Sequence, residues 1–187
     1  MKRIILFCSI VLIACCSSCK KGEDDPSLSM RTRKARLTGN WKMKEGTVSL
    51  KINDSTVVWT LKENSYVYTN FKGGTSDGVY NLALNFTKDG QVNFTEKFNN
   101  DNFESNGKWE FQGRVGKAKN KEHISIHLES IKGYTGYFDS FNKSQVDFSY
   151  KIKELRNEKL VLVSENELLT VSSTRKVYIT AEYSFEQ

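Results

Sequence analysis

The sequence predicts an all-β domain, an antiparallel up-and-down meander of about 8–10 strands that closes into a β-barrel. The 187 residues include 11 Phe, 8 Tyr and 3 Trp but a single proline, while Asn, Ser, Thr and Gly fill the intervals between apolar runs. That composition is typical of strands joined by turns. Apolar and polar residues alternate with a period of two from Trp41 onward, without a convincing helical period. A long meander tends to close because closure removes exposed strand edges.

The first strands are predicted from a change of parity. Trp41 and Met43 share one face, whereas the apolar residues at 48, 50 and 52 have the opposite parity. Gly46 lies between the two sets, which predicts a β-bulge over residues 45–47. Turn-forming residues at 53–55 precede a second alternating run, so residues 47–62 are predicted to form a hairpin.

The middle of the chain contains the clearest hairpin. Tyr66 and Tyr68 predict one strand, and a loop follows up to Gly78. Alternating residues at 82–86 and 92–98 flank the turn Lys88-Asp89-Gly90, which is the pattern of a β-hairpin. A polar loop is expected at 99–102, before a strand that contains Trp109 and Phe111.

The second half predicts strands at 124–128, 146–152, 160–163 and 177–185, with a turn at 156–158. Residues 165–169 allow a helical turn. The segment 133–141 breaks the alternation while it remains aromatic. Its rings Tyr134, Tyr137, Phe138 and Phe141 either contact a ligand or partner, or fold inward as a plug over the open end of the barrel.

The N-terminus has the pattern of an export signal. Lys2 and Arg3 precede an uncharged apolar run at 4–14. This run is too short to span a bilayer, which takes roughly 20 residues. Cysteines follow at positions 15, 16 and 19, and the fourth cysteine is Cys8. The chain after Cys19 therefore has no thiol and can form no disulfide.

This N-terminus resembles the signals of bacterial lipoproteins, in which a cysteine is acylated and becomes the mature N-terminus. Cys19 is favoured as the palmitate-type attachment site because the charged run at 20–25 belongs beyond the cleavage site. Cys15 is the alternative, since Leu12-Ile13-Ala14-Cys15 matches the usual motif better. The resemblance implies a signal peptide at 1–18 and a protein anchored in the cell envelope, at the surface or periplasmic face of the outer membrane.

Residues 19–36 are predicted to be the lipidated N-terminus and a flexible tether, because they are charged or small and lack an apolar period. The domain is expected to span 37–187. Arg31, Arg33, Lys34 and Arg36 either contact anionic headgroups or remain solvated.

The start of the domain, Gly39-Asn40-Trp41, resembles the Gly-x-Trp motif of lipocalins and of bacterial lipocalin-like domains. The hairpin at 86–92, the strand at Gly107-Lys108-Trp109 and the hairpin at 150–162 are similar in arrangement. The resemblance implies a lipocalin-like barrel over 37–187. It also implies that Trp41 closes one end of the barrel beneath Arg175, through a cation–π contact.

Several classes of function are not expected. The formal charge of +6 lacks the continuous basic stripe of a nucleic-acid-binding protein. His123 and His127 would lie roughly 13 Å apart on a strand, too far to share a zinc ion. Asp and Glu are assigned to outward positions or turns, and the chain has no nucleophile elbow or phosphate loop. We therefore expect no catalytic residue, metal or cofactor.

The sequence favours a membrane-anchored lipoprotein whose barrel binds a small apolar or glycan ligand, or a protein partner of the envelope. The alternative is a structural or accessory subunit of an envelope complex, with a barrel filled by its own side chains and no ligand.

Overall fold

The structure is a computed structural model that describes residues 23–26, 29–52, 55–70, 72–113, 121–129, 146–172 and 175–187. For residues 146, 165–172 and 175–177 it describes the backbone alone. The described elements are α2 (Arg33–Leu37), β1 (Gly39–Ile52), β2 (Ser55–Lys62), β3 (Ser65–Thr69), β4 (Thr75–Gly78), β5 (Tyr80–Phe86), β6 (Gln91–Phe98), β7 (Asp101–Phe111), β8 (His123–Leu128), β9 (Val146–Leu155), β10 (Lys159–Ser172) and β11 (Arg175–Glu186).

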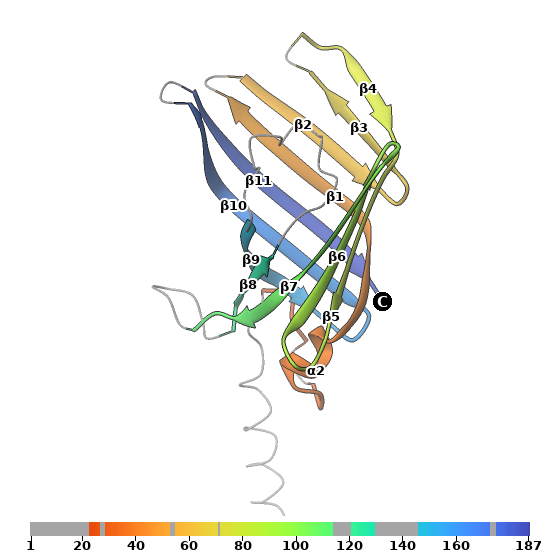
Figure 1. Cartoon of the computed structure of the whole chain (residues 1–187), viewed down its shortest axis with the longest axis vertical. Helices are drawn as coiled ribbons and strands as arrows, with labels where there is room; N and C mark the ends of the chain where they lie inside the picture. The colour runs from red at the N-terminus through yellow and green to blue at the C-terminus, as the bar shows by residue number, and fades with distance from the viewer. Residues whose placement is uncertain are drawn as a thin grey trace, which may run out of the picture.

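Eight strands form a closed antiparallel barrel, in the order β1, β5, β6, β7, β8, β9, β10 and β11, with β11 paired back to β1. The barrel in Figure 1 is covered at its lower end by α2. We call this the closed end, and the opposite end the wide end. The predicted all-β antiparallel barrel is thus confirmed, with a strand count inside the predicted range.

The barrel widens because β1 changes its neighbour partway along. Residues 39–42 of β1 pair with β5, whereas residues 45–52 pair with β2. The register between β1 and β11 shifts between Met43 and Glu45, so a bulge lies at the point of the change. The hairpin of β2 and β3 fills the gap that opens there, and β4 leads the chain back into β5 (Figure 1).

The closed end is packed around Trp41. Its side chain is fully buried, and its indole Nε1 donates a 2.7 Å hydrogen bond to the carbonyl oxygen of Leu37, at the end of α2. Trp109 lies nearby in the core: its ring meets that of Phe86 edge to face at 5.6 Å, and its Nε1 donates to Thr87 O at 3.1 Å. Lys34 of α2 lies over the Trp109 ring at 5.8 Å. The short helix therefore covers the aromatic base of the barrel.

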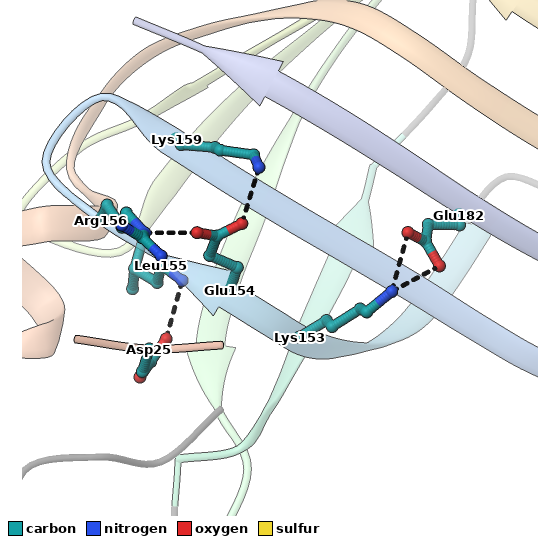
Figure 2. Close-up of polar contacts among 7 residues, drawn as sticks. All are labelled: Asp25, Lys153, Glu154, Leu155, Arg156, Lys159 and Glu182. Atoms are coloured by element: carbon teal, nitrogen blue, oxygen red, sulfur yellow. Dashed lines mark hydrogen bonds and ion pairs between the residues drawn. The ribbon is translucent and has the colours of Figure 1, made fainter. Parts of the chain in front are cut away.

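Residues 23–25 lie along β9 and extend the contacts of the closed end. Asp24 N donates to Lys153 O at 2.9 Å, and Glu23 forms an ion pair with Lys151 at 2.6 Å. Asp25 accepts a 2.7 Å hydrogen bond from Leu155 N, as Figure 2 shows, and pairs with the buried Arg33. Part of the segment that the sequence assigned to a flexible tether is thus packed against the barrel.

The turn at the end of β9 holds a compact group of charges. Glu154 is buried and lies between Arg156 and Lys159, whose Nζ is 2.9 Å from its carboxylate (Figure 2). Burial alone would raise the pKa of Glu154, but the hydrogen bonds from Lys159 and Arg156 outweigh it and lower that pKa. Farther along β9, Lys153 reaches Glu182 on β11 at 3.1 Å.

Most strand predictions are confirmed, including the hairpins at 47–62 and 82–98. The bulge predicted over 45–47 lies slightly earlier, between Met43 and Glu45. The loop expected before Gly78 is in part the strand β4. The loop expected at 99–102 is wrong, because β7 begins at Asp101 after a tight turn in which Asn99 has a φ of 54°. The helical turn allowed at 165–169 is also wrong. That segment belongs to β10, with a register shift between Ser164 and Glu167.

Candidate functional site

The inner surface of the barrel becomes aromatic toward the wide end. The aromatic residues there are only partly buried although they pack against the core. These residues come from five strands and are Trp59, Tyr68, Phe94, Phe98, Phe148, Tyr150 and Tyr183. We call them the mouth aromatics. Partly exposed rings on an inward face are suited to contact a ligand, because each has apolar area still to bury.

Four rings stack where the hairpin of β2 and β3 meets β6. Trp59 lies over Tyr68, with centroids 4.6 Å apart, and Tyr66 stacks on Phe98 at 5.0 Å. Trp59 also approaches Phe98 at 6.0 Å. The Trp59 Nε1 is buried and has no acceptor in the part of the chain that the structure describes. An unsatisfied indole donor marks a position where the packing leaves a polar group without a partner.

A cavity of about 20 Å³ lies among four of the mouth aromatics, Phe94, Phe148, Tyr150 and Tyr183, together with Leu82, Ile126 and their neighbours. It has room for about one water molecule. Small-molecule sites usually occupy about 300–1,000 Å³. The middle of the barrel, at this level, is therefore filled by its own side chains.

Glu96 brings a carboxylate to the inner surface. It lies on β6 between Phe94, which lines the cavity, and Phe98, which belongs to the stacked rings. Its Oε1 accepts a 2.7 Å hydrogen bond from the hydroxyl of the buried Tyr80. Among the described residues, no ion pair joins Glu96 to a basic side chain. The group is thus an acid held among aromatic rings with one neutral hydrogen-bond donor.

The surroundings shift the ionisation of both partners. Burial raises the pKa of Glu96, and the hydrogen bond from Tyr80 offsets only part of that effect. Burial also raises the pKa of Tyr80 well above its ordinary value, and Glu96, Tyr183 and Tyr150 raise it further. Each of these neighbours disfavours a second negative charge. A positively charged group would relieve the same cost.

The structure does not bring Trp41 and Arg175 together. Lys42, next to Trp41, pairs with Glu186 near one end of β11, whereas Arg175 begins the other end of that strand. Among the arginines at the closed end, Arg36 is buried and donates to the carbonyl oxygen of Leu155. The α2 segment, which precedes β1, closes the barrel at Trp41. The predicted partner, Arg175, lies instead at the opposite end of β11.

Other predicted site residues lie outside the described residues. These are the lipidation candidates Cys15 and Cys19, the signal peptide at 1–18, and the aromatic residues Tyr134, Tyr137, Phe138 and Phe141. His123 and His127 are on β8, as the alternation predicted. His127 Nδ1 lies 2.8 Å from Asp147. No group of three metal-ligating side chains occurs within the described ranges.

The sequence prediction that Asp and Glu face outward is wrong at Glu96. The signal was present, because Glu96 has the same parity as Val92, Phe94 and Phe98 on a strand that was correctly predicted. A charged residue at an apolar position of a strand is easily taken for a break in the alternation. Glu96 is instead part of the inner surface.

Comparisons with known proteins identify no relative from which a function could be inferred. No protein-family model matches the chain, and no curated protein matches its sequence. Within the described residues, no helix combines the length and apolar character needed to cross a membrane.

Proposed function

We propose that this protein is a lipid-anchored envelope lipoprotein with a lipocalin-like barrel, which binds a small ligand through its wide end. The observation that carries the proposal is the set of mouth aromatics, which are only partly buried although they pack against the core of the barrel. Stacked rings such as Trp59 and Tyr68 can bury the apolar face of a ligand or of a sugar. The protein acts as a binding protein and not as an enzyme.

The contacts of residues 23–25 support a definite orientation. If Cys19 carries the lipid, its Cα lies within about 14 Å of that of Glu23, the longest span of four residues. Glu23 is paired with β9 near the closed end. The closed end would then face the bilayer, where the exposed Arg31, Lys34 and Lys88 meet anionic headgroups. The wide end would point away from the membrane.

Native mass spectrometry tests the binding function. The full-length protein is purified in detergent from its own cells, and the spectrum is expected to contain a noncovalent small-molecule adduct. The variant Phe98→Ala removes a ring that contacts Trp59 and Tyr66, so it should lower the adduct population. Val67→Ala, an exposed change on β3, is the matched control. A wild-type spectrum without any adduct, together with unchanged tryptophan fluorescence across a panel of apolar and glycan ligands, would contradict the proposal.

The anchor has its own test. Cys19→Ala should release the protein from the membrane fraction, while Cys15→Ala should not. Mass spectrometry of the mature N-terminus identifies the acylated residue directly. Loss of membrane association in Cys15→Ala alone would show that Cys15 is the lipidated residue. An unmodified N-terminus in the wild type would show that the protein carries no lipid anchor there.

A second function is favoured by the cavity of about 20 Å³. A barrel whose middle is filled is suited to a structural or accessory subunit of an envelope complex, in which the outer surface contacts a protein partner. In that case crosslinking in intact cells captures one envelope protein reproducibly, and the substitution Phe98→Ala changes neither ligand binding nor capture.

A further inference from the structure

We propose that the wide end binds a small organic ammonium ion, with the Glu96 carboxylate as its counter-ion and the mouth aromatics packed against its apolar groups. This inference rests on the proposed binding function and specifies the chemical class of the ligand.

Glu96 is a carboxylate that pairs with no basic side chain among the described residues. Glu96 is surrounded by Tyr80, Phe94 and Phe98, and Tyr80 supplies its one hydrogen bond from the described residues. A desolvated carboxylate without a cationic partner costs free energy, and proteins that retain such groups commonly use them at binding or catalytic sites. A ligand with a positive charge turns this cost into a favourable interaction.

The surroundings of Glu96 limit the type of cation. A metal ion such as Ca²⁺ requires roughly six to eight oxygen ligands. Glu96 is flanked by aromatic rings, which supply no such ligands. The faces of Trp and Tyr rings attract ammonium groups, and most strongly when water is excluded. Trp59 and Tyr68 are partly buried rings of this kind on the hairpin of β2 and β3. Tyr150 and Tyr183, which meet edge to face at 6.4 Å, line the cavity of about 20 Å³. This combination favours an organic ammonium ion.

The cavity that Phe94 lines accepts no more than a water-sized group, so we place the ligand at the level of Glu96 and on its wide-end side. Phe98 and Trp59 lie on the wide-end side of Glu96 and are partly exposed. An ammonium group can therefore reach the carboxylate from the wide end while its apolar part stays between the rings.

Calorimetry with two isosteric probes tests the inference on the full-length protein in detergent. Choline carries a quaternary ammonium, and 3,3-dimethylbutan-1-ol has the same shape without the charge. Choline should bind at least about tenfold more tightly than the alcohol. Glu96→Gln keeps the size of the side chain, and it should weaken choline binding by at least about tenfold while it leaves the affinity for the alcohol unchanged.

Two further variants keep the test decisive. Glu104→Gln removes an exposed carboxylate from β7, beside β6, and should bind choline as the wild type does, which controls for general electrostatics. Tyr68→Leu removes a ring face but keeps Glu96, and should reduce the preference for choline over the alcohol. Equal affinity for both probes, no choline binding at millimolar concentration, or an unchanged preference in Glu96→Gln overturns the inference. A neutral or glycan ligand that binds equally to the wild type and Glu96→Gln overturns it while the proposed function stands.

Discussion

The indole nitrogen of Trp41 donates a hydrogen bond of 2.7 Å to the carbonyl oxygen of Leu37, and both side chains are completely buried. The contact joins the first strand to the helix that precedes it. Because Leu37 is the last residue of α2, no N–H of a following helical turn can donate to its carbonyl oxygen. Trp41 therefore fixes α2 over the closed end and satisfies a polar atom that burial removes from water.

Trp41→Phe should lower the free energy of unfolding by about 1–3 kcal/mol, because it retains an aromatic ring but leaves the Leu37 carbonyl without its donor. Chemical denaturation followed by far-ultraviolet circular dichroism measures the change. Lys42→Ala, an exposed neighbour on β1, should change stability by less than about 0.5 kcal/mol. Equal stability of Trp41→Phe and the wild type would show that the hydrogen bond contributes nothing.

The sequence predicted this end of the barrel in part. Trp41 was recognised because its motif and its parity agree, and both depend on residues near it in the chain. Its partner was predicted incorrectly, since Arg175 lies at the opposite end of β11 and Leu37 directly follows a segment with no apolar period. A helix of five residues leaves too short a pattern to detect.

The difference between local patterns and distant contacts also explains which other features could be predicted. Alternation is a local property, so hairpins such as β5 with β6 could be predicted from one stretch of sequence. The change of neighbour by β1, from β5 to β2, depends on pairing between distant residues and leaves no local pattern. Glu96 was missed for a related reason, because its inward direction follows from the strand while its residue type indicates the surface.

Gly107 lies where β7 and β8 approach each other closely. A Cβ atom at this position would overlap the carbonyl oxygen and carbon of His127, both of which belong to the backbone of β8. The neighbouring strand cannot move away without breaking its pairing. Gly107→Ala should therefore cost about 3 kcal/mol or more, or abolish folding.

Gly113→Ala is the matched control, because a Cβ there meets no atom within 4 Å. Its stability should remain within about 0.5 kcal/mol of the wild type. Thermal unfolding of both variants gives the comparison. A Gly107→Ala protein as stable as Gly113→Ala would mean that β7 and β8 are farther apart in solution than the structure places them.

Asp25 holds the N-terminal segment through two buried contacts, one to the guanidinium of Arg33 and one from Leu155 N at 2.7 Å. Burial lowers the pKa of Arg33, and Asp25 acts in the opposite direction by stabilising its charge. Asp25→Asn leaves a buried guanidinium without its counter-ion. The expected loss of stability is about 3–5 kcal/mol, measured by chemical denaturation.

A second substitution separates the charge from the packing. Asp25→Asn combined with Arg33→Met removes both charges and should recover part of the lost stability. Glu23→Gln, which affects the exposed pair with Lys151, should have little effect. If the double variant is no more stable than Asp25→Asn, the hydrogen bond to Leu155 carries the contribution of Asp25.

Glu96 should make the stability of the protein depend on pH in the opposite direction from an ordinary paired carboxylate. Its folded-state pKa lies above the ordinary value of 4.5, since burial disfavours its charged form. The folded state therefore binds a proton more readily than the unfolded state. Stability falls as the pH rises from 4.5 through the folded-state pKa, and the loss is complete above it. Tyr80, Tyr150 and Tyr183 face the same region, and burial holds the pKa of Tyr80 well above its ordinary value, so Tyr80 remains protonated throughout this interval.

Glu96→Gln should therefore be more stable than the wild type at pH 8, because it removes a partly desolvated charge and keeps an acceptor for Tyr80. The difference should shrink as the pH falls through the folded-state pKa, where Glu96 itself becomes neutral. Urea denaturation at several pH values measures both proteins, with Glu104→Gln as the exposed control. A difference that grows toward acidic pH would mean that Glu96 is stabilised as a carboxylate in the folded state. Such a site would already contain a counter-charge and would not require a cationic ligand.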